Sequence, residues 1–202
     1  MSAEGPPLNP EAIFEALEHN DVDYVLVGGL AARLRGASKL TSDVDLCPAW
    51  TTENLERLAA TLRQLGAELL IDEGSVETVP FPLDARAIDR FELAAWRTSA
   101  GDLDVLVGIP RTSLADLSRY SDLIEGASAM ELDGRKVQVA ALEAIIRSKE
   151  VIGRPKDREA LPELYALRDQ QTMDEELPRS VPRDPEHGPR AAHQPPEPGL
   201  ER

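Results

Sequence analysis

The chain has 202 residues, of which 42% are hydrophobic and 4% aromatic, with a formal net charge of −15 at pH 7. This length and composition predict one folded domain with an aliphatic core, and the single Cys47 excludes an intramolecular disulfide and a cysteine-based zinc site. No apolar run reaches the roughly 18 residues of a membrane span, and most of the acidic surface would repel a nucleic-acid backbone. We therefore expect a cytoplasmic protein without a membrane partner.

The first third of the chain predicts helices and strands in alternation. Asn9 is a candidate cap for a helix that ends at Asn20, and residues 24–27 form a β-rich run closed by Gly28-Gly29. A short helix over 30–36, a strand over 42–46 and a helix over 52–65 follow. Thr51 or Thr52 caps the last of these helices, and Gly66 ends it.

The middle and end of the folded part continue this alternation. Strands are predicted at 68–71, 91–98 and 103–107, with a loop around Pro80 and Pro82. A short helix is expected over 114–120, a hairpin about Asp133-Gly134, a helix over 142–152 ended by Gly153, and a last helix over 156–168 with Pro162 as a kink position. Alternating elements without internal repeats predict an α/β fold.

The composition changes beyond Gln171, where proline and charged residues replace the aliphatic ones. Seven of the 16 prolines lie in this segment. It carries seven acidic residues against four arginines, which leaves a charge of −12 on residues 1–171. Because such a segment cannot bury enough apolar surface to fold, we expect a domain over 1–171 and a disordered Pro-rich tail over 172–202.

Two Asp-x-Asp pairs carry the candidate chemistry. Asp43 and Asp45 lie on one predicted strand, and Asp102 and Asp104 lie on a later one. Since side chains alternate along a strand, the members of each pair share a face, with Cα atoms about 6.6 Å apart. Neighbouring carboxylates raise each other's pKa unless a cation lies between them, and Mg²⁺ accepts carboxylate and phosphate oxygens. The pattern predicts a two-metal site for phosphoryl or nucleotidyl transfer.

Gly28-Gly29 ends a strand and opens a helix immediately before the first aspartate pair. Backbone N–H groups at such a turn can approach a triphosphate closely, because glycine has no side chain. A glycine pair alone is more often an ordinary tight turn. Its functional interpretation here depends on the aspartates.

The strings YVLVGGLAA at 24–32 and TSDVDL at 41–46 resemble the glycine turn and Asp-x-Asp signature of polymerase-β-like nucleotidyltransferases. They are most similar to the minimal members of toxin and antitoxin loci, including the AbiEii and MenT toxins. The likeness includes residues 53–55 and covers nearly the whole chain except the tail. It implies a small mixed β-sheet flanked by helices, with a C-terminal helical portion. It also implies transfer of a nucleoside monophosphate from an NTP such as ATP to the 3′ end of tRNA, with a cognate antitoxin or toxin as partner.

The resemblance also assigns roles to individual residues. It favours Asp104 over Asp102 as the third carboxylate, and it implies a helix-borne lysine and a later acidic residue near the nucleotide. The expected catalytic residues are Asp43, Asp45, Asp104 and Lys149, the first three as ligands of Mg²⁺ or Mn²⁺, and the expected nucleotide-binding residues are Gly28, Gly29, Lys149 and Asp157. One departure is that the family's usual Gly-Ser turn is Gly28-Gly29 here, so the serine hydroxyl is absent.

Other interpretations stand beside this one. The same chemistry could act on a protein acceptor, as in antitoxins of this fold that adenylylate their partner, and the acidic surface favours that acceptor over RNA. A nucleotide-binding module without turnover is the third hypothesis. The basic run over 147–158 is equally well explained by cations that stabilise a helix end, and Asp157 could serve only the dipole of the last helix.

Overall fold

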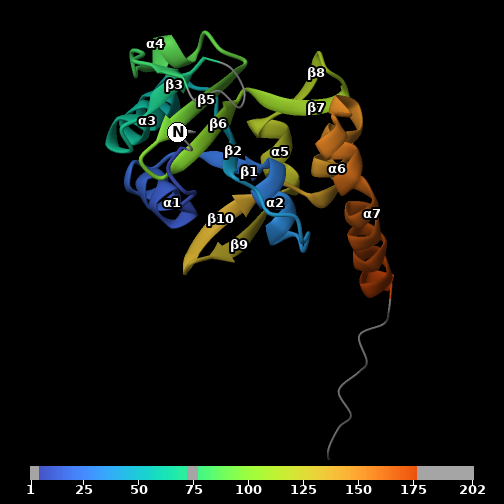
Figure 1. Cartoon of the computed structure of the whole chain (residues 1–202). Coiled ribbons are helices and arrows are strands. Elements are labelled where there is room, and N and C mark those ends of the chain that lie inside the picture. The colour runs from blue at the N-terminus through green and yellow to red at the C-terminus, as the bar shows by residue number, and fades with distance from the viewer. Residues whose placement is uncertain (1–4, 72–76, 177–202) are drawn as a thin grey trace, which may run out of the picture.

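The computed structural model of the protein describes residues 5–71 and 77–176 (Figure 1). The helices are α1 (Pro10–His19), α2 (Gly28–Leu34), α3 (Thr52–Gln64), α4 (Ala85–Ile88), α5 (Tyr120–Gly126), α6 (Leu142–Ile152) and α7 (Pro155–Glu176). The strands are β1 (Tyr24–Val27), β2 (Asp43–Pro48), β3 (Glu68–Leu70), β4 (Thr78–Val79), β5 (Leu93–Thr98), β6 (Gly101–Leu106), β7 (Gly108–Ser113), β8 (Asp116–Arg119), β9 (Ser128–Leu132) and β10 (Arg135–Val139). From residue 177 onward, the predicted tail lies outside the described residues.

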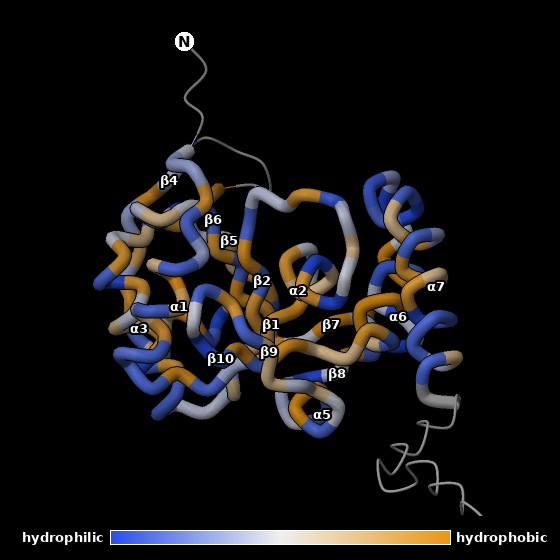
Figure 2. Tube along the Cα trace, turned by 90° about the horizontal axis from the view of Figure 1, so that it is seen from below, coloured by the Kyte–Doolittle hydropathy of each residue, from blue (hydrophilic) through white to orange (hydrophobic). Residues whose placement is uncertain are grey.

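Eight strands form one mixed sheet in the order β4-β3-β5-β6-β2-β1-β10-β9, and β7 pairs with β8 in a separate hairpin. The pairs β2–β6 and β1–β10 are parallel, and the other neighbours are antiparallel. Helices α1 and α3 lie on one side of the sheet, and α6 and α7 lie on the other (Figures 1 and 2). This arrangement confirms the predicted α/β class with a mixed sheet flanked by helices. No helix of the described part of the chain is long and apolar enough to cross a membrane.

Local sequence signals account for several element ends. The Asn9 side chain accepts a hydrogen bond from the N–H of Ala12 at 3.2 Å and caps α1, as predicted. Thr51, and not Thr52, caps α3. Helix α6 ends at Gly153, whose φ of 64° lies in the left-handed region that favours glycine. The predicted hairpin is β9–β10.

One prediction of local structure is wrong, and two are wrong only in part. Residues 116–119 form β8 and not a helix, because β7 and β8 pair as a hairpin in which Arg111 and Asp116 form an ion pair at 2.7 Å. The stretch around the prolines is not only a loop. It contains β4, which pairs with β3, and α4, which begins where the Asp84 side chain accepts from the N–H of Ala87 at 2.8 Å. The last helix continues past residue 168 to Glu176, with Pro162 inside it.

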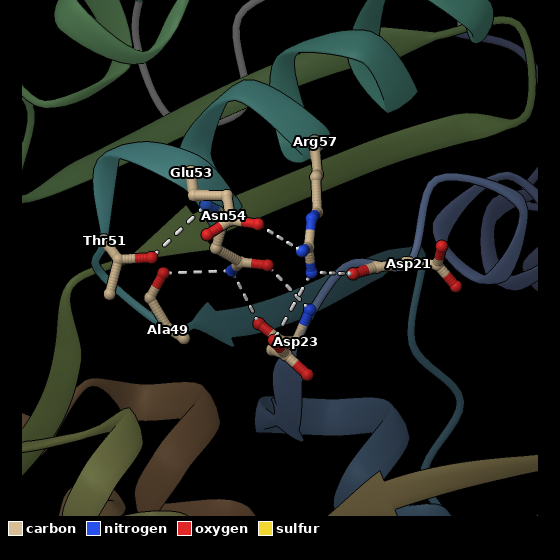
Figure 3. A network of polar contacts seen from close by, with 7 residues as sticks. All are labelled: Asp21, Asp23, Ala49, Thr51, Glu53, Asn54 and Arg57. Atoms are coloured by element: carbon tan, nitrogen blue, oxygen red, sulfur yellow. Dashed lines mark hydrogen bonds and ion pairs between the residues drawn. The ribbon is translucent and has the colours of Figure 1, made fainter.

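The register of β1 on β2 is held by Asn54 in the first turn of α3 (Figure 3). Its side-chain oxygen accepts from the N–H of Asp23 at 2.8 Å, and its amide nitrogen donates to the carbonyl oxygens of Asp23 and Ala49, both at 2.9 Å. Asn54 is 2% exposed, so these bonds are shielded from water. They tie the residue before β1 to the residue after β2. Since a slip of one residue would turn every side chain of a strand to the opposite face, this network keeps the aspartates of β2 where they are.

Candidate active site

The site residues predicted from the sequence all line one pocket, between the sheet and the α6–α7 pair. Its walls come from the start of α2, from β2 and β6, from residues 37–41, from β7, and from α6 and α7. The pocket brings together Gly28, Gly29, Asp43, Asp45, Asp104, Lys149 and Asp157. Gly28 and Asp157, at opposite ends of this set in the sequence, therefore meet in one place, at the point where β1 leads into α2.

Pairing of β2 with β6 brings the two Asp-x-Asp pairs side by side. Asp45 is the register partner of Asp104, and Asp43 is the partner of Asp102. Neighbouring strands lie about 4.8 Å apart, and residues two apart on a strand share a face. The four carboxylates thus project from the same face of two adjacent strands.

Asp102 and Asp104 have different surroundings. Arg97 on β5 donates to both oxygens of Asp102, from Nε at 3.0 Å and from Nη2 at 3.1 Å, and Asp102 is outside the residues that line the pocket. Asp104 lines the pocket. The guanidinium neutralises Asp102, so Asp104 is the carboxylate of β6 that is placed to act with Asp45.

The glycine turn lies directly against Asp45. Gly28 has a φ of 65°, and a Cβ there would stand 1.9 Å from Oδ2 of Asp45, so only glycine fits. The N–H of Gly29 donates to the same Oδ2 at 3.3 Å. In this structure that N–H serves a protein carboxylate, and contact of the turn with a triphosphate stays a prediction.

The Asp45 carboxylate titrates far from its ordinary range. Burial, and next the negative charge of Asp43, raise the pKa of Asp45 from 3.8 to about 6. The hydrogen bond from Gly29 and the charges of Lys149 and Lys156 act in the opposite direction and only partly offset this rise. The charges of Lys149 and Lys156 thus offset only part of the cost of keeping Asp45 ionised at this buried position.

The donor set fits a hard divalent cation, although the carboxylates do not form a ready-made coordination shell. Among the described residues, no three His, Cys, Asp or Glu groups converge closely enough to hold a metal ion. Asp43 Oδ1 accepts from the Thr41 hydroxyl at 2.5 Å, and Asp45 accepts from Gly29. A carboxylate has about four lone-pair sites, so these bonds leave capacity for a cation. Oxygen donors, together with an ionised Asp45 that its neighbours stabilise only in part, suit Mg²⁺.

Lys149 and Asp157 form the centre of an ion cluster between α6 and α7. Asp157 is 1% exposed, and its two oxygens accept from Lys149 Nζ at 3.1 Å and from Arg154 Nε at 2.9 Å. Burial raises the pKa of Asp157, but the hydrogen bonds from Arg154 and Lys149 outweigh it and hold this pKa below its usual value. Asp157 is thus an ionised group that positions two cations at the pocket.

Three further cations line the pocket that the sequence did not single out as expected site residues. Lys39, Arg154 and Lys156 line the pocket beside Lys149, and Lys39 is paired with Glu159 at 3.1 Å. The basic run was visible in the sequence, but its members diverge in the fold, because Arg147 and Arg158 are outside the lining residues. Gly153 marks the end of α6, but which of these cations approach the carboxylates depends on how α6 and α7 pack against the rest of the fold, which is a long-range arrangement.

The end of the pocket beyond Asp104 is apolar. Leu106 shares a face of β6 with Asp104, its cross-strand partner Leu93 is 51% exposed, and Ile109 and Pro110 of β7 line the same pocket. The lining residues that β5 and β7 contribute carry no charge. The cations that line the pocket therefore come from residues 37–41, from α6 and α7 and from the turn between them, and not from β5 or β7.

No protein-family model matches the chain, and no curated protein matches it closely. Among solved structures, the lincosamide antibiotic adenylyltransferase LnuA, bound to lincomycin, has a TM-score of 0.52 and 14% identity, covering 80% of this chain and 99% of that one. The solution structure of the antibiotic-resistance factor ANT(2'')-Ia has a TM-score of 0.48 and 19% identity, over 82% and 83%. The crystal structure of ANT(2'')-Ia with adenylyl-2''-tobramycin has a TM-score of 0.47 and 18% identity, covering 82% of this chain and 96% of that one. The likeness to LnuA is one of fold, and it confirms the nucleotidyltransferase fold predicted from the sequence.

Proposed function

We propose that the protein is a Mg²⁺-dependent nucleotidyltransferase of the polymerase-β-like superfamily that moves a nucleoside monophosphate from an NTP to a hydroxyl. The observation that carries this proposal is the register of β2 on β6, which sets Asp45 beside Asp104 in a pocket that also holds four cationic side chains. The fold shared with LnuA, an adenylyltransferase, supports the same chemistry.

Each group has a distinct task in the reaction. Asp43, Asp45 and Asp104 would hold the cation, which when bound polarises the phosphoryl oxygens and the attacking hydroxyl. Lys149, kept in place by Asp157, offers charge-assisted hydrogen bonds to the phosphates. Asp104, which shares a face of β6 with Leu106, would take the proton of the attacking acceptor hydroxyl. The acceptor oxygen bonds to the α-phosphorus, the bond from that phosphorus to the bridging oxygen breaks, and pyrophosphate leaves.

The acceptor is the second part of the proposal. The likeness to AbiEii and MenT toxins favours the 3′ end of tRNA, in the cytoplasm and with a cognate antitoxin partner. A protein acceptor is the alternative, because residues 1–171 carry a charge of −12 and the pocket end beyond Asp104 is apolar. A small hydroxyl compound is the third acceptor class, which the lincomycin-bound fold neighbour suggests.

The test measures transfer of label from each of four α-phosphate-labelled NTPs to three kinds of acceptor. These are total tRNA, a co-expressed protein encoded by an adjacent gene, and the small compounds lincomycin and tobramycin. We expect label on one acceptor class, dependent on Mg²⁺ and lost in Asp43→Ala. Asp102→Asn is the matched control, because it changes a carboxylate of the same sheet face that Arg97 already neutralises. It should retain most of the activity.

Two results would overturn the proposal. If none of the acceptors takes up label in a metal-dependent way, the proposed transfer reaction is contradicted. If Asp43→Ala labels an acceptor as well as the wild type does, the proposed active site is contradicted. If calorimetry shows that NTP binds but no labelled product forms, the hypothesis of a nucleotide-binding module without turnover is supported instead.

A further inference from the structure

Thr41 lies two residues before β2 and forms a hydrogen bond with the first aspartate of that strand. Its hydroxyl donates to Oδ1 of Asp43 at 2.5 Å, and Thr41 lines the same pocket as the carboxylates. A carboxylate without such a bond rotates among several orientations. The hydroxyl therefore restricts how Asp43 presents its oxygens.

Thr41 also explains why residue 29 is a glycine. A Cβ at Gly29 would stand 2.7 Å from Oγ1 and 2.9 Å from Cβ of Thr41, closer than real Cβ contacts. Unlike Gly28, Gly29 does not have a positive φ, so its backbone would accept a side chain. The Thr41 side chain is therefore what excludes a side chain at position 29.

These two observations concern the same small volume. A serine at position 29 would have its Cβ 2.7 Å from Oγ1 of Thr41, so its side chain would enter space that the Thr41 side chain occupies. We propose that Thr41 is a positioning residue: its hydroxyl holds the Asp43 carboxylate for a divalent cation, and it takes the space that a serine of the glycine turn would fill. This inference rests on the proposed function.

The first test measures cation affinity directly, by calorimetric titration of the full-length protein with Mn²⁺. Loss of a hydrogen-bonding partner of a metal ligand costs about 10-fold to 100-fold in metal affinity. We expect Thr41→Val, which keeps the side-chain shape, to bind Mn²⁺ at least about tenfold more weakly, and Thr41→Ser to stay near the wild type. The Mg²⁺ concentration for half-maximal transfer should rise by a similar factor in Thr41→Val, while kcat at saturating Mg²⁺ changes much less.

The second test moves the hydroxyl back to the turn. Gly29→Ser alone should unfold at lower temperature than the wild type, because its side chain meets Thr41. The double variant Gly29→Ser with Thr41→Gly removes that clash, and we expect it to bind Mn²⁺ more tightly than Thr41→Gly alone. This pair of variants keeps the inference testable if Thr41→Val does not fold.

The outcomes separate this inference from the proposed function. Equal Mn²⁺ affinity in the wild type and Thr41→Val, with normal transfer, overturns the role of Thr41 and leaves the function intact. Failure of Gly29→Ser to improve on Thr41→Gly overturns the claim that the two positions share one space. A wild type that binds no Mn²⁺ and transfers no label contradicts the proposed function, and this inference with it.

Discussion

Replacing Asp45 by asparagine should stabilise the metal-free protein while it abolishes transfer. The pKa of Asp45 is raised from 3.8 to about 6 in the folded chain, so the folded state binds this proton more tightly than the unfolded state. Ionisation of Asp45 therefore favours unfolding, and the penalty grows as pH rises through the window from about 4 to 6. A shift of about two pKa units corresponds to about 3 kcal/mol above pH 7. Asparagine removes the charge and keeps an oxygen that can accept from Gly29.

The assay is thermal unfolding in EDTA at pH 7.5 and at pH 4. For a domain of this size, about 3 kcal/mol corresponds to a rise in Tm of about 6 to 12 °C for Asp45→Asn at pH 7.5, with little change at pH 4. Adding Mg²⁺ should raise the Tm of the wild type, because a ligand of the folded state stabilises it, but not that of the variant. Asp102→Asn is the control and should lower the Tm, because it breaks the bidentate pair with Arg97. A Tm of Asp45→Asn at or below that of the wild type at pH 7.5 refutes the reasoning.

Three further changes have definite expected results. Asn54→Ala should lower the free energy of unfolding in urea by about 2 kcal/mol, because it removes three hydrogen bonds and takes away the acceptor of the Asp23 N–H. The Asp23 and Ala49 carbonyls keep hydrogen bonds from the N–H groups of Ala49 and Thr51, and a loss below about 0.5 kcal/mol would count against the register role. Leu93→Lys should raise the KM for the acceptor several-fold and leave the KM for NTP unchanged, and an effect on NTP alone would place the acceptor elsewhere. Asp157→Asn should cost about 3 kcal/mol at pH 7 and weaken NTP binding, because Lys149 and Arg154 lose their counter-charge. Since the folded pKa of Asp157 is lowered, this stabilisation should fade as pH falls through the acid range, and a pH-independent loss would contradict it.

The elements that the sequence predicted well have signals within one turn of their ends. The Asn9 and Thr51 caps and the Gly153 stop are short-range hydrogen-bonding or backbone effects, which act the same way wherever the segment lies. The hairpin about Asp133-Gly134 is of the same kind, with φ values of 50° and 80° at its two turn residues. Such features depend little on the rest of the chain.

The elements that the sequence missed depend on strand pairing with a neighbouring element. Strand β4 has two residues and exists because β3 pairs with it, and β8 is a strand because β7 lies beside it. Neither segment carries enough periodicity of its own to be distinguished from a loop or a short helix. Tertiary pairing therefore overrides their local preference.

The spacing in the sequence by itself determined that Asp43 and Asp45 share a face, because the strand period is two. It left the choice between Asp102 and Asp104 to a family resemblance. Only the tertiary structure decided which of the two lies in the pocket, since antiparallel pairing with β5 brings Arg97 to Asp102 and parallel pairing with β2 sets Asp104 beside Asp45. Strand pairing is a long-range arrangement, so the neighbours of each carboxylate cannot be read from either strand segment alone.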